Sequence, residues 1–243
     1  MRALTVRLAV LTAVALLAGL LPPVPESSSY EVVTVANGGA IEGKVVFTGN
    51  PPPPRKVIPT KDKEVCGGIR EVPPIVLAPD KGVQEAFVYL KAVDKGKAWE
   101  KPAKTPAIDN EKCDFQPHVQ IIQAGEIEIV NSDPVLHNTH GFYGKVTAFN
   151  VALPNKDQRI KKPLKRSGLV RVECDAHGWM LGWIYVADNP YYAVTAKDGT
   201  FTIKDVPPGQ YTLVAWQEHT GEREIPVTVK PKEGVSLTID LKK

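Results

Sequence analysis

The loop at residues 174–180 carries three side chains that bind soft or borderline metal ions. It places a thiol, an imidazole and a thioether at Cys174, His177 and Met180, in the spacing Cys-x2-His-x2-Met. In copper sites for electron transfer, two imidazoles and a thiolate lie in one plane and a thioether binds weakly along the axis. Met180 is the only methionine after Met1, so it is not one of many apolar fillers. The loop therefore predicts a copper site that needs one more imidazole.

Alternating apolar residues on both sides of this loop predict the strands that position it. Val170, Val172 and Cys174 recur at every second position before the loop, and Ile184 and Val186 do so after it. Side chains at every second position of a strand lie on one face of the sheet. We therefore expect the Cys174 thiol to point toward a buried face.

The missing imidazole is most simply supplied by His137, which follows a strand and a turn at Asp133-Pro134. We expect the amide of the next residue, Asn138, to hydrogen-bond to the backbone of the other ligand loop and hold the two loops together. His140 is either a residue at the rim or a rival ligand. Of the other two candidates, His118 is interpreted as a residue within a strand and His219 as a surface residue.

The cysteine count indicates one disulfide and one free thiol. The three cysteines are Cys66, Cys113 and Cys174, and an odd number in an oxidising compartment favours one pair and one thiol with another role. Since Cys174 lies in the ligand loop, Cys66 and Cys113 are the expected disulfide. The alternative is three unpaired thiols, which oxidise readily outside the cell.

The N-terminus predicts export. A basic start is followed by an apolar run at Leu8–Leu21 and by Pro22, which is typical of a secretory signal. The run is shorter than the roughly 20 residues of a spanning helix, so we expect a signal peptide at 1–26 rather than an uncleaved anchor. No cysteine follows the run, which disfavours a lipoprotein. The mature chain is then periplasmic or extracellular, with no stable membrane insertion.

Composition indicates an all-β protein that does not bind nucleic acid. The 243 residues include 22 prolines and 19 glycines, and short Val/Ile-rich alternating runs lie between these breakers, as in all-β chains. The formal net charge is only +3, which argues against nucleic acid binding as the main role. One basic segment, Asn155–Arg166, is interpreted as a solvated loop or as a docking site for an acidic partner.

Two longer patterns surround the candidate ligands. Residues 131–138 read Asn-x-Asp-x3-His-Asn, and residues 168–186 read Gly-x-Val-x-Val-x-Cys-x2-His-x2-Met-x-Gly-x-Ile-x-Val. With Phe115-x-Pro and Gly125-Glu before them, they resemble the cupredoxin family of type 1 blue copper proteins. The ligand spacing resembles that of amicyanins more than that of plastocyanins. The resemblance covers 115–186 and implies four copper ligands: His137, Cys174, His177 and Met180.

The cupredoxin resemblance implies a Greek-key β-sandwich and sets the expected domain boundaries. We expect a flexible leader at 27–39, then a cupredoxin-like domain at 40–187 with its core at 113–187, in which 40–90 supplies additional strands. Residues 188–243 resemble the carboxypeptidase regulatory or transthyretin-like β-sandwich module, through Ala196–Ile203 and Asp205–Leu213. The alternative is that Ile41–Phe47 opens this second module and the cupredoxin core is inserted in it.

The expected function is that of an electron carrier, not an enzyme, with copper as cofactor and other redox proteins as partners. The sequence does not indicate an oligomeric state. We expect Trp179, Leu181 and Trp183 to exclude water from the site or to form a contact patch, although ordinary sandwich core explains Trp183 equally well. Two alternatives remain. One is a copper storage or delivery protein using His137, His140 and Met180; the other is a β-sandwich interaction module without metal.

Overall fold

The computed structural model describes residues 30–242. The expected signal peptide at 1–26 lies outside the described residues, as does the start of the expected leader. Within 30–242 no helix is long and apolar enough to cross a membrane. Nearly every element of this part is a strand, and its one helix, α1 (Lys63–Cys66), has 4 residues. The all-β class is confirmed.

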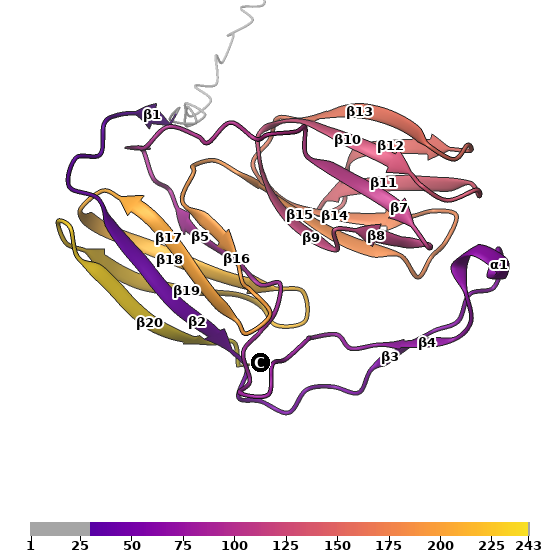
Figure 1. The fold of residues 1–243 in the computed structure, drawn as a ribbon, viewed down its shortest axis with the longest axis horizontal. Helices are drawn as coiled ribbons and strands as arrows, with labels where there is room; N and C mark the ends of the chain where they lie inside the picture. The colour runs from indigo at the N-terminus through magenta and orange to yellow at the C-terminus, as the bar shows by residue number, and fades with distance from the viewer. Residues whose placement is uncertain (1–29, 243) are drawn as a thin grey trace, which may run out of the picture.

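The first sandwich packs two sheets face to face between residues 107 and 187 (Figure 1). One sheet has the order β13-β10-β7-β8 and the other the order β12-β11-β14-β15-β9. Ile127 and Ile129 of one sheet meet Val170 and Val172 of the other in one buried cluster, as their alternation predicts. The strands are β7 (Ala107–Glu111), β8 (Asp114–Gln116), β9 (Val119–Gln123), β10 (Gly125–Asn131), β11 (His137–Tyr143), β12 (Val146–Leu153), β13 (Gln158–Leu164), β14 (Gly168–Cys174) and β15 (Leu181–Ala187).

The basic segment Asn155–Arg166 is not a loop, because its middle forms strand β13. This strand lies at the edge of its sheet and pairs antiparallel with β10. Arg159 forms an ion pair of 2.8 Å with Glu128 of β10. Charged side chains on an edge strand disfavour pairing with another chain, and the basic run suits this position.

The second sandwich is built from both ends of the described chain. One sheet has the order β17-β2-β20 and the other the order β16-β5-β18-β19. Ile41 and Val45 of β2 are buried with Phe201 of β17 and Ile239 of β20. The strands are β2 (Gly39–Val46), β5 (Phe87–Lys91), β16 (Tyr192–Val194), β17 (Thr200–Val206), β18 (Gly209–Gln217), β19 (Gly221–Val229) and β20 (Gly234–Asp240).

This pairing corrects the expected boundaries. β2 runs parallel to β20 and antiparallel to β17, and β5 lies between β16 and β18. Residues 40–90 therefore supply no strand to the first sandwich, and the first sandwich is inserted in the second. The leader also differs from the expectation, because β1 (Glu31–Val32) pairs with β6 (Lys95–Gly96) and the Tyr30 hydroxyl donates to the Lys97 carbonyl at 2.7 Å.

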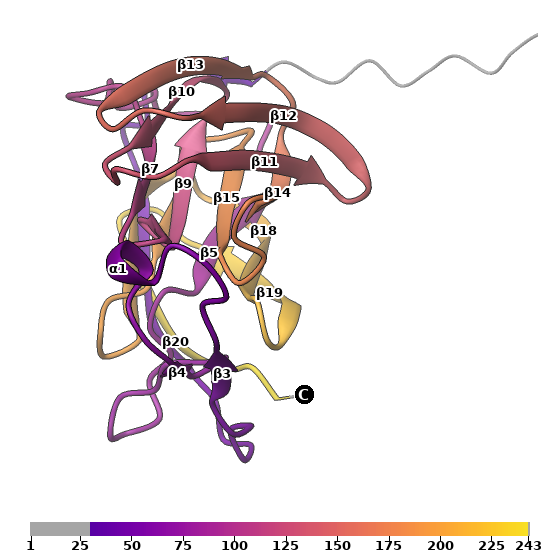
Figure 2. The same ribbon diagram turned by 90° about the vertical axis from the view of Figure 1, so that its right-hand side faces the viewer.

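A strap, defined here as residues 55–72, connects the two sandwiches. It consists of the antiparallel pair β3 (Arg55–Val57) and β4 (Arg70–Val72) with α1 between them. Figures 1 and 2 show that the strap runs from the second sandwich and places α1 beside the first. The disulfide Cys66–Cys113 fixes α1 to the turn between β7 and β8. The predicted disulfide is thus confirmed.

The two sandwiches meet through aromatic side chains. Phe87 and Trp216 of the second sandwich are buried with Val119 of the first. Trp216 also packs against Trp183 of β15, with 5.0 Å between ring centroids. Aromatic rings bury large areas, so this contact fixes the position of the first sandwich against the second.

Candidate metal centre

Three of the predicted donors converge at one end of the first sandwich. Cys174 is the last residue of β14 and His137 the first of β11, and these strands are antiparallel neighbours. The Cys174 Sγ lies 3.7 Å from His137 Nδ1 and 3.6 Å from His177 Nδ1. The two Nδ1 atoms are 3.1 Å apart. Strand pairing thus brings together residues that are far apart in the sequence.

Two carboxylates fix the orientation of both imidazoles. Asp133 Oδ2 lies 2.9 Å from His137 Nε2, and Asp62 Oδ2 lies 2.9 Å from His177 Nε2. A carboxylate accepts hydrogen bonds, so each Nε2 carries a proton and donates it. In a neutral imidazole the other nitrogen, Nδ1, then presents a lone pair. Both lone pairs belong to the nitrogens that face Cys174, and this is the arrangement a metal ion requires.

Burial favours the neutral form of the His137 imidazole. The side chains of His137 and His177 are both completely buried. Removal from water lowers the pKa of His137, and the neighbouring His177 adds to this effect against the opposing influence of Asp133. A metal ion binds imidazole in its neutral form, so the environment holds His137 in the state that can bind one.

Backbone amides surround the Cys174 sulfur. Burial raises the pKa of this thiol, while N–H groups of Asn138, His177 and Ala176 act in the opposite direction. The Asn138 N–H points at Sγ from 3.4 Å. A thiolate in this position would be stabilised by these dipoles, and a bound cation would supply the rest of the stabilisation.

Met180 lies in the same buried cluster as Cys174. It is 2 % exposed, and its N–H donates to the His177 carbonyl at 2.9 Å. A second local bond joins the His177 N–H to the Cys174 carbonyl at 3.2 Å. The two turns fold the Cys-x2-His-x2-Met segment back on itself, so that Met180 returns to the core beside the strand that ends at Cys174.

Asn138 links the two ligand loops, although not in the predicted manner. Its side-chain amide donates to the Asp175 carboxylate at 2.8 Å rather than to the backbone. The backbone link runs the other way, from the Asp175 N–H to the Asn138 carbonyl at 3.0 Å. His140 belongs to this polar group, since its Nδ1 lies 3.1 Å from Asp175 and its Nε2 lies 3.0 Å from Thr147. The structure does not bring His140 to the Cys174 sulfur.

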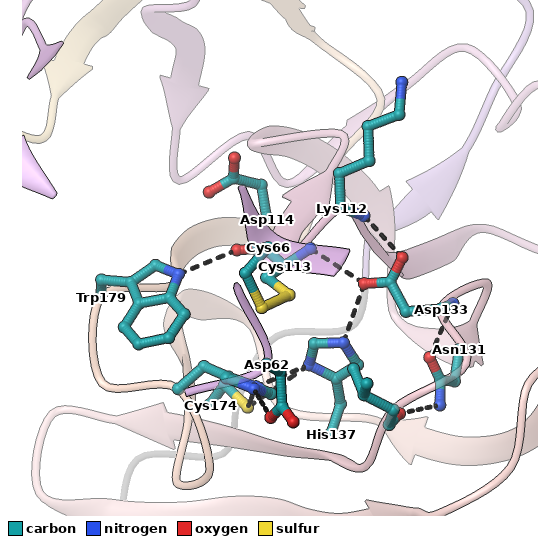
Figure 3. The surroundings of a disulfide bond; sticks show 12 residues. Asp62, Cys66, Lys112, Cys113, Asp114, Asn131, Asp133, His137, Cys174 and Trp179 are labelled. Atoms are coloured by element: carbon teal, nitrogen blue, oxygen red, sulfur yellow. Dashed lines mark hydrogen bonds and ion pairs between the residues drawn. A yellow bond between two sulfur atoms is a disulfide. The ribbon is translucent and has the colours of Figure 1, made fainter. Parts of the chain in front are cut away.

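The turn between β7 and β8 serves as a support for His137. Lys112 and Cys113 form its centre and both have left-handed backbone, with φ of 53° and 55°. This conformation costs non-glycine residues about 1–2 kcal/mol each. Their consecutive N–H groups donate to the two oxygens of Asp133, at 2.7 and 2.9 Å (Figure 3). These bonds offset the strain and hold the carboxylate that orients His137.

The disulfide and one indole close the site from the side of the strap. The sulfur atoms of Cys66 and Cys113 lie within 4.8 Å of a His177 ring nitrogen. Trp179 packs against His177 with 5.1 Å between ring centroids, and its Nε1 donates to the Cys113 carbonyl at 3.2 Å (Figure 3). The expectation that Trp179 shields the site is in accord with this position. Leu181 and Trp183 line a cavity beside it instead.

Sequence reasoning missed both carboxylates. Asp133 had a signal, because it lies four residues before His137 in the turn that leads to β11. Asp62 had none, since it lies in an irregular charged segment more than a hundred residues before His177. The two remaining histidines lie outside the donor group. His118 pairs with Glu218 at 3.1 Å, and the His219 ring packs edge-on against Phe47.

Comparison with protein families gives one match. A family model described as "Polysaccharide lyase family 4, domain II" matches residues 170–237. This range runs from β14 of the first sandwich through most of the second. The description differs from the carboxypeptidase regulatory module expected for 188–243. No curated protein matches the chain.

Solved cupredoxins resemble part of the chain. A purple cupredoxin from Nitrosopumilus maritimus is 22% identical over 34% of this chain and 99% of its own, with a TM-score of 0.31. Amicyanin from Paracoccus versutus is 23% identical over 36% and 86%, with a TM-score of 0.32. The copper-containing nitrite reductase of Thermus scotoductus is 22% identical over 40% and 25%, with a TM-score of 0.31. Each of these matches covers 40% of this chain or less.

Proposed function

We propose that this chain is an exported type 1 copper protein that carries single electrons between redox proteins. The observation that supports the proposal is the convergence of two imidazole Nδ1 atoms and one thiol sulfur, 3.1–3.7 Å apart, in a buried position. Copper takes such a donor set, together with a thioether, in electron-transfer sites; here His137, His177 and Cys174 would hold the ion, and Met180 would supply the thioether. When bound, copper supplies a couple between its cuprous and cupric states.

The chain's own residues would hold the ligands in place during that exchange. Asp62 and Asp133 fix both rings through Nε2, and the sheet fixes Cys174 at the end of β14. Outer hydrogen bonds of this kind set ligand orientation and basicity. Ligands held in this way would move little when the charge at their centre changes, which would keep the cost of reorganisation small. That property favours a carrier.

Burial of the donors supports a carrier over an enzyme. His137 and His177 are completely buried and Cys174 is 2 % exposed, so a substrate reaches none of them unless the covering residues move. An electron needs no such access. The disulfide supports an oxidising compartment, in agreement with a periplasmic or extracellular location. The partners we propose are other redox proteins.

The test is the visible spectrum of the protein after loading with Cu(II), together with metal analysis. We expect a strong band at about 600 nm, the mark of a copper–thiolate bond that the cupredoxin resemblance implies. Cys174→Ser should abolish the band, while the matched control His140→Ala should keep it. A colourless protein that retains copper would favour storage or delivery. A protein that binds no copper would favour an interaction module.

A further inference from the structure

A cavity lies where the strap, the first sandwich and the second sandwich meet. Its volume is about 290 Å³, just below the usual range for small-molecule sites, about 300–1,000 Å³. Its lining is mostly apolar and includes two indole rings, and its polar groups come from all three parts of the molecule. Six residues carry the argument: Arg55, Val72, His118, Trp179, Trp183 and Glu218.

Hydrogen bonds hold the walls of this cavity in position. Arg55 of the strap donates to the Trp179 carbonyl at 3.2 Å. On the opposite side, Trp183 Nε1 donates to Glu218 at 2.6 Å. Gln217 donates to the Pro74 carbonyl at 3.1 Å and fixes the chain just after the strap to the second sandwich. Because the residues that line the cavity are already fixed, little of their conformational entropy would be lost when a ligand binds.

The cavity is lined by charges of both signs, because Arg55 lies near Glu218 and helps to lower the pKa of its carboxyl. Glu218 accepts from His118 Nε2 at 3.1 Å, and Asp114 at the margin pairs with Arg70 at 2.6 Å. Burial opposes ionisation of Glu218, yet the bonds from His118 and Trp183 lower the pKa of this carboxyl overall. An ion of either sign would meet a like charge as well as an opposite one, and it would lose its hydration. The lining therefore favours an uncharged molecule.

We propose that this cavity binds a small uncharged hydroxyaromatic ring, of the phenol and hydroquinone class. The apolar wall with its two indoles favours a flat ring over a saturated one. The Glu218 carboxylate has about four acceptor positions, so beyond its bonds to His118 and Trp183 it can accept a hydroxyl proton. Arg55 has five N–H donors and can donate to a second oxygen. Trp179 lines the cavity and packs against His177, so the bound ring lies next to the metal centre.

The test measures binding of hydroquinone to the metal-free protein by NMR of the four tryptophan indole N–H groups. We expect saturable shifts for Trp179 and Trp183 and none for Trp99, which lies away from this cavity. Cyclohexane-1,4-diol has two hydroxyls but no aromatic face, and benzoate has the ring with a charge. We expect each to bind at least about tenfold more weakly. Because no metal is present, the result does not depend on the function proposed above.

Two variants locate the site. Val72→Phe fills the cavity and should weaken hydroquinone binding at least about tenfold, while Ile69→Phe on the same strap, 70 % exposed, should leave it unchanged. Glu218→Gln removes the charged acceptor and should weaken binding about tenfold, which keeps the proposal testable if Val72→Phe does not fold. Equal shifts at all four indoles, equal binding of cyclohexane-1,4-diol, or full binding by both cavity variants would overturn the proposal.

Discussion

The two sandwiches bury very different side chains. Within residues 30–242, the first buries two histidines and an aspartate, together with Asn110, Asn131 and Thr139. The second buries no imidazole or carboxylate, and its buried polar residues are Asn189, Thr195 and Gln217. Both sandwiches are built from strands in which apolar residues alternate with polar ones, and the apolar residues form one buried cluster. The difference is confined to one end of the first sandwich, where β11, β14 and the strap meet.

This difference shows what the strap contributes. Burial of titratable groups is costly unless each has a partner. The first sandwich alone supplies a carboxylate for His137 but none for His177. The second carboxylate, Asp62, arrives on the strap, which the disulfide fixes in place. The apolar second sandwich therefore provides the frame, and the strap that leaves it completes the polar centre of its neighbour.

The largest effect should follow from removal of the disulfide, which would make the two sandwiches differ in stability. The bond joins residues 47 positions apart, and chain entropy for such a loop gives about 4 kcal/mol. Replacement of Cys66 and Cys113 by serine should lower hydrogen-exchange protection in β10 and β14 by up to this amount. The amides of β18 and β19 should keep their protection. Equal loss in both sandwiches would contradict this division.

A medium effect should follow from changes to the two carboxylates. Asp133→Asn and Asp62→Asn each replace the charged acceptor of a candidate ligand imidazole by a neutral amide, and mutation of such outer partners typically lowers metal affinity about 10–100-fold. The Asp133 side chain is 6 % exposed and that of Asp62 is 32 %, so we expect the larger loss for Asp133. The measurement is a copper competition titration. Asp198→Asn in the second sandwich is the control and should change nothing. A larger loss for Asp62 would refute the ranking.

The smallest effect concerns the His118–Glu218 pair, which joins the two sandwiches. Burial lowers the pKa of His118, but the bond to Glu218 outweighs it and raises the pKa above 6.5 overall. The contribution of His118 is then complete below about pH 6.5 and is lost as pH rises through its folded pKa. Glu218, whose pKa is lowered from 4.5, contributes above that value and loses its contribution as pH falls through its folded pKa.

The pair should therefore stabilise the protein most between about pH 4.5 and 6.5. Since His118 is partly exposed, we expect less than about 1 kcal/mol. Urea unfolding at about pH 5.5 and about pH 8.5 measures this contribution, because the two values lie inside and above that window. His118→Gln should lower the unfolding free energy more at the lower pH than at the higher one. A loss of the same size at both values would show that the ion pair is not the cause.

The candidate ligands were predictable because their signals are local. Cys174, His177 and Met180 lie within one short loop, and the alternation at Val170 and Val172 fixes which face the thiol occupies. His137 followed from its strand-end position. The disulfide was predictable from the number of cysteines. Each of these predictions needs only a short segment of the sequence or the number of cysteines.

The insertion and the strap depend on contacts that no short segment encodes. Alternation in Ile41–Phe47 predicts a strand with one buried face, but it does not say whether that strand pairs with 201–203 or with the ligand-bearing sheets. Asp62 similarly lies in a segment without periodicity. Asp62 can bond to His177 only because the disulfide holds the strap beside the first sandwich.

The insertion also determines the order in which the molecule can form. Every strand of the first sandwich lies between residues 107 and 187, whereas the second requires β2 beside β20, and the Thr48 hydroxyl bonds to Asp240, 192 positions away. Contacts of such separation form late, because the whole intervening chain must first be confined. The strands of the first sandwich can thus all be paired while the second sandwich is still open. Once they are paired, the two ends of the inserted segment lie at fixed positions, and this brings the two halves of the second sandwich together.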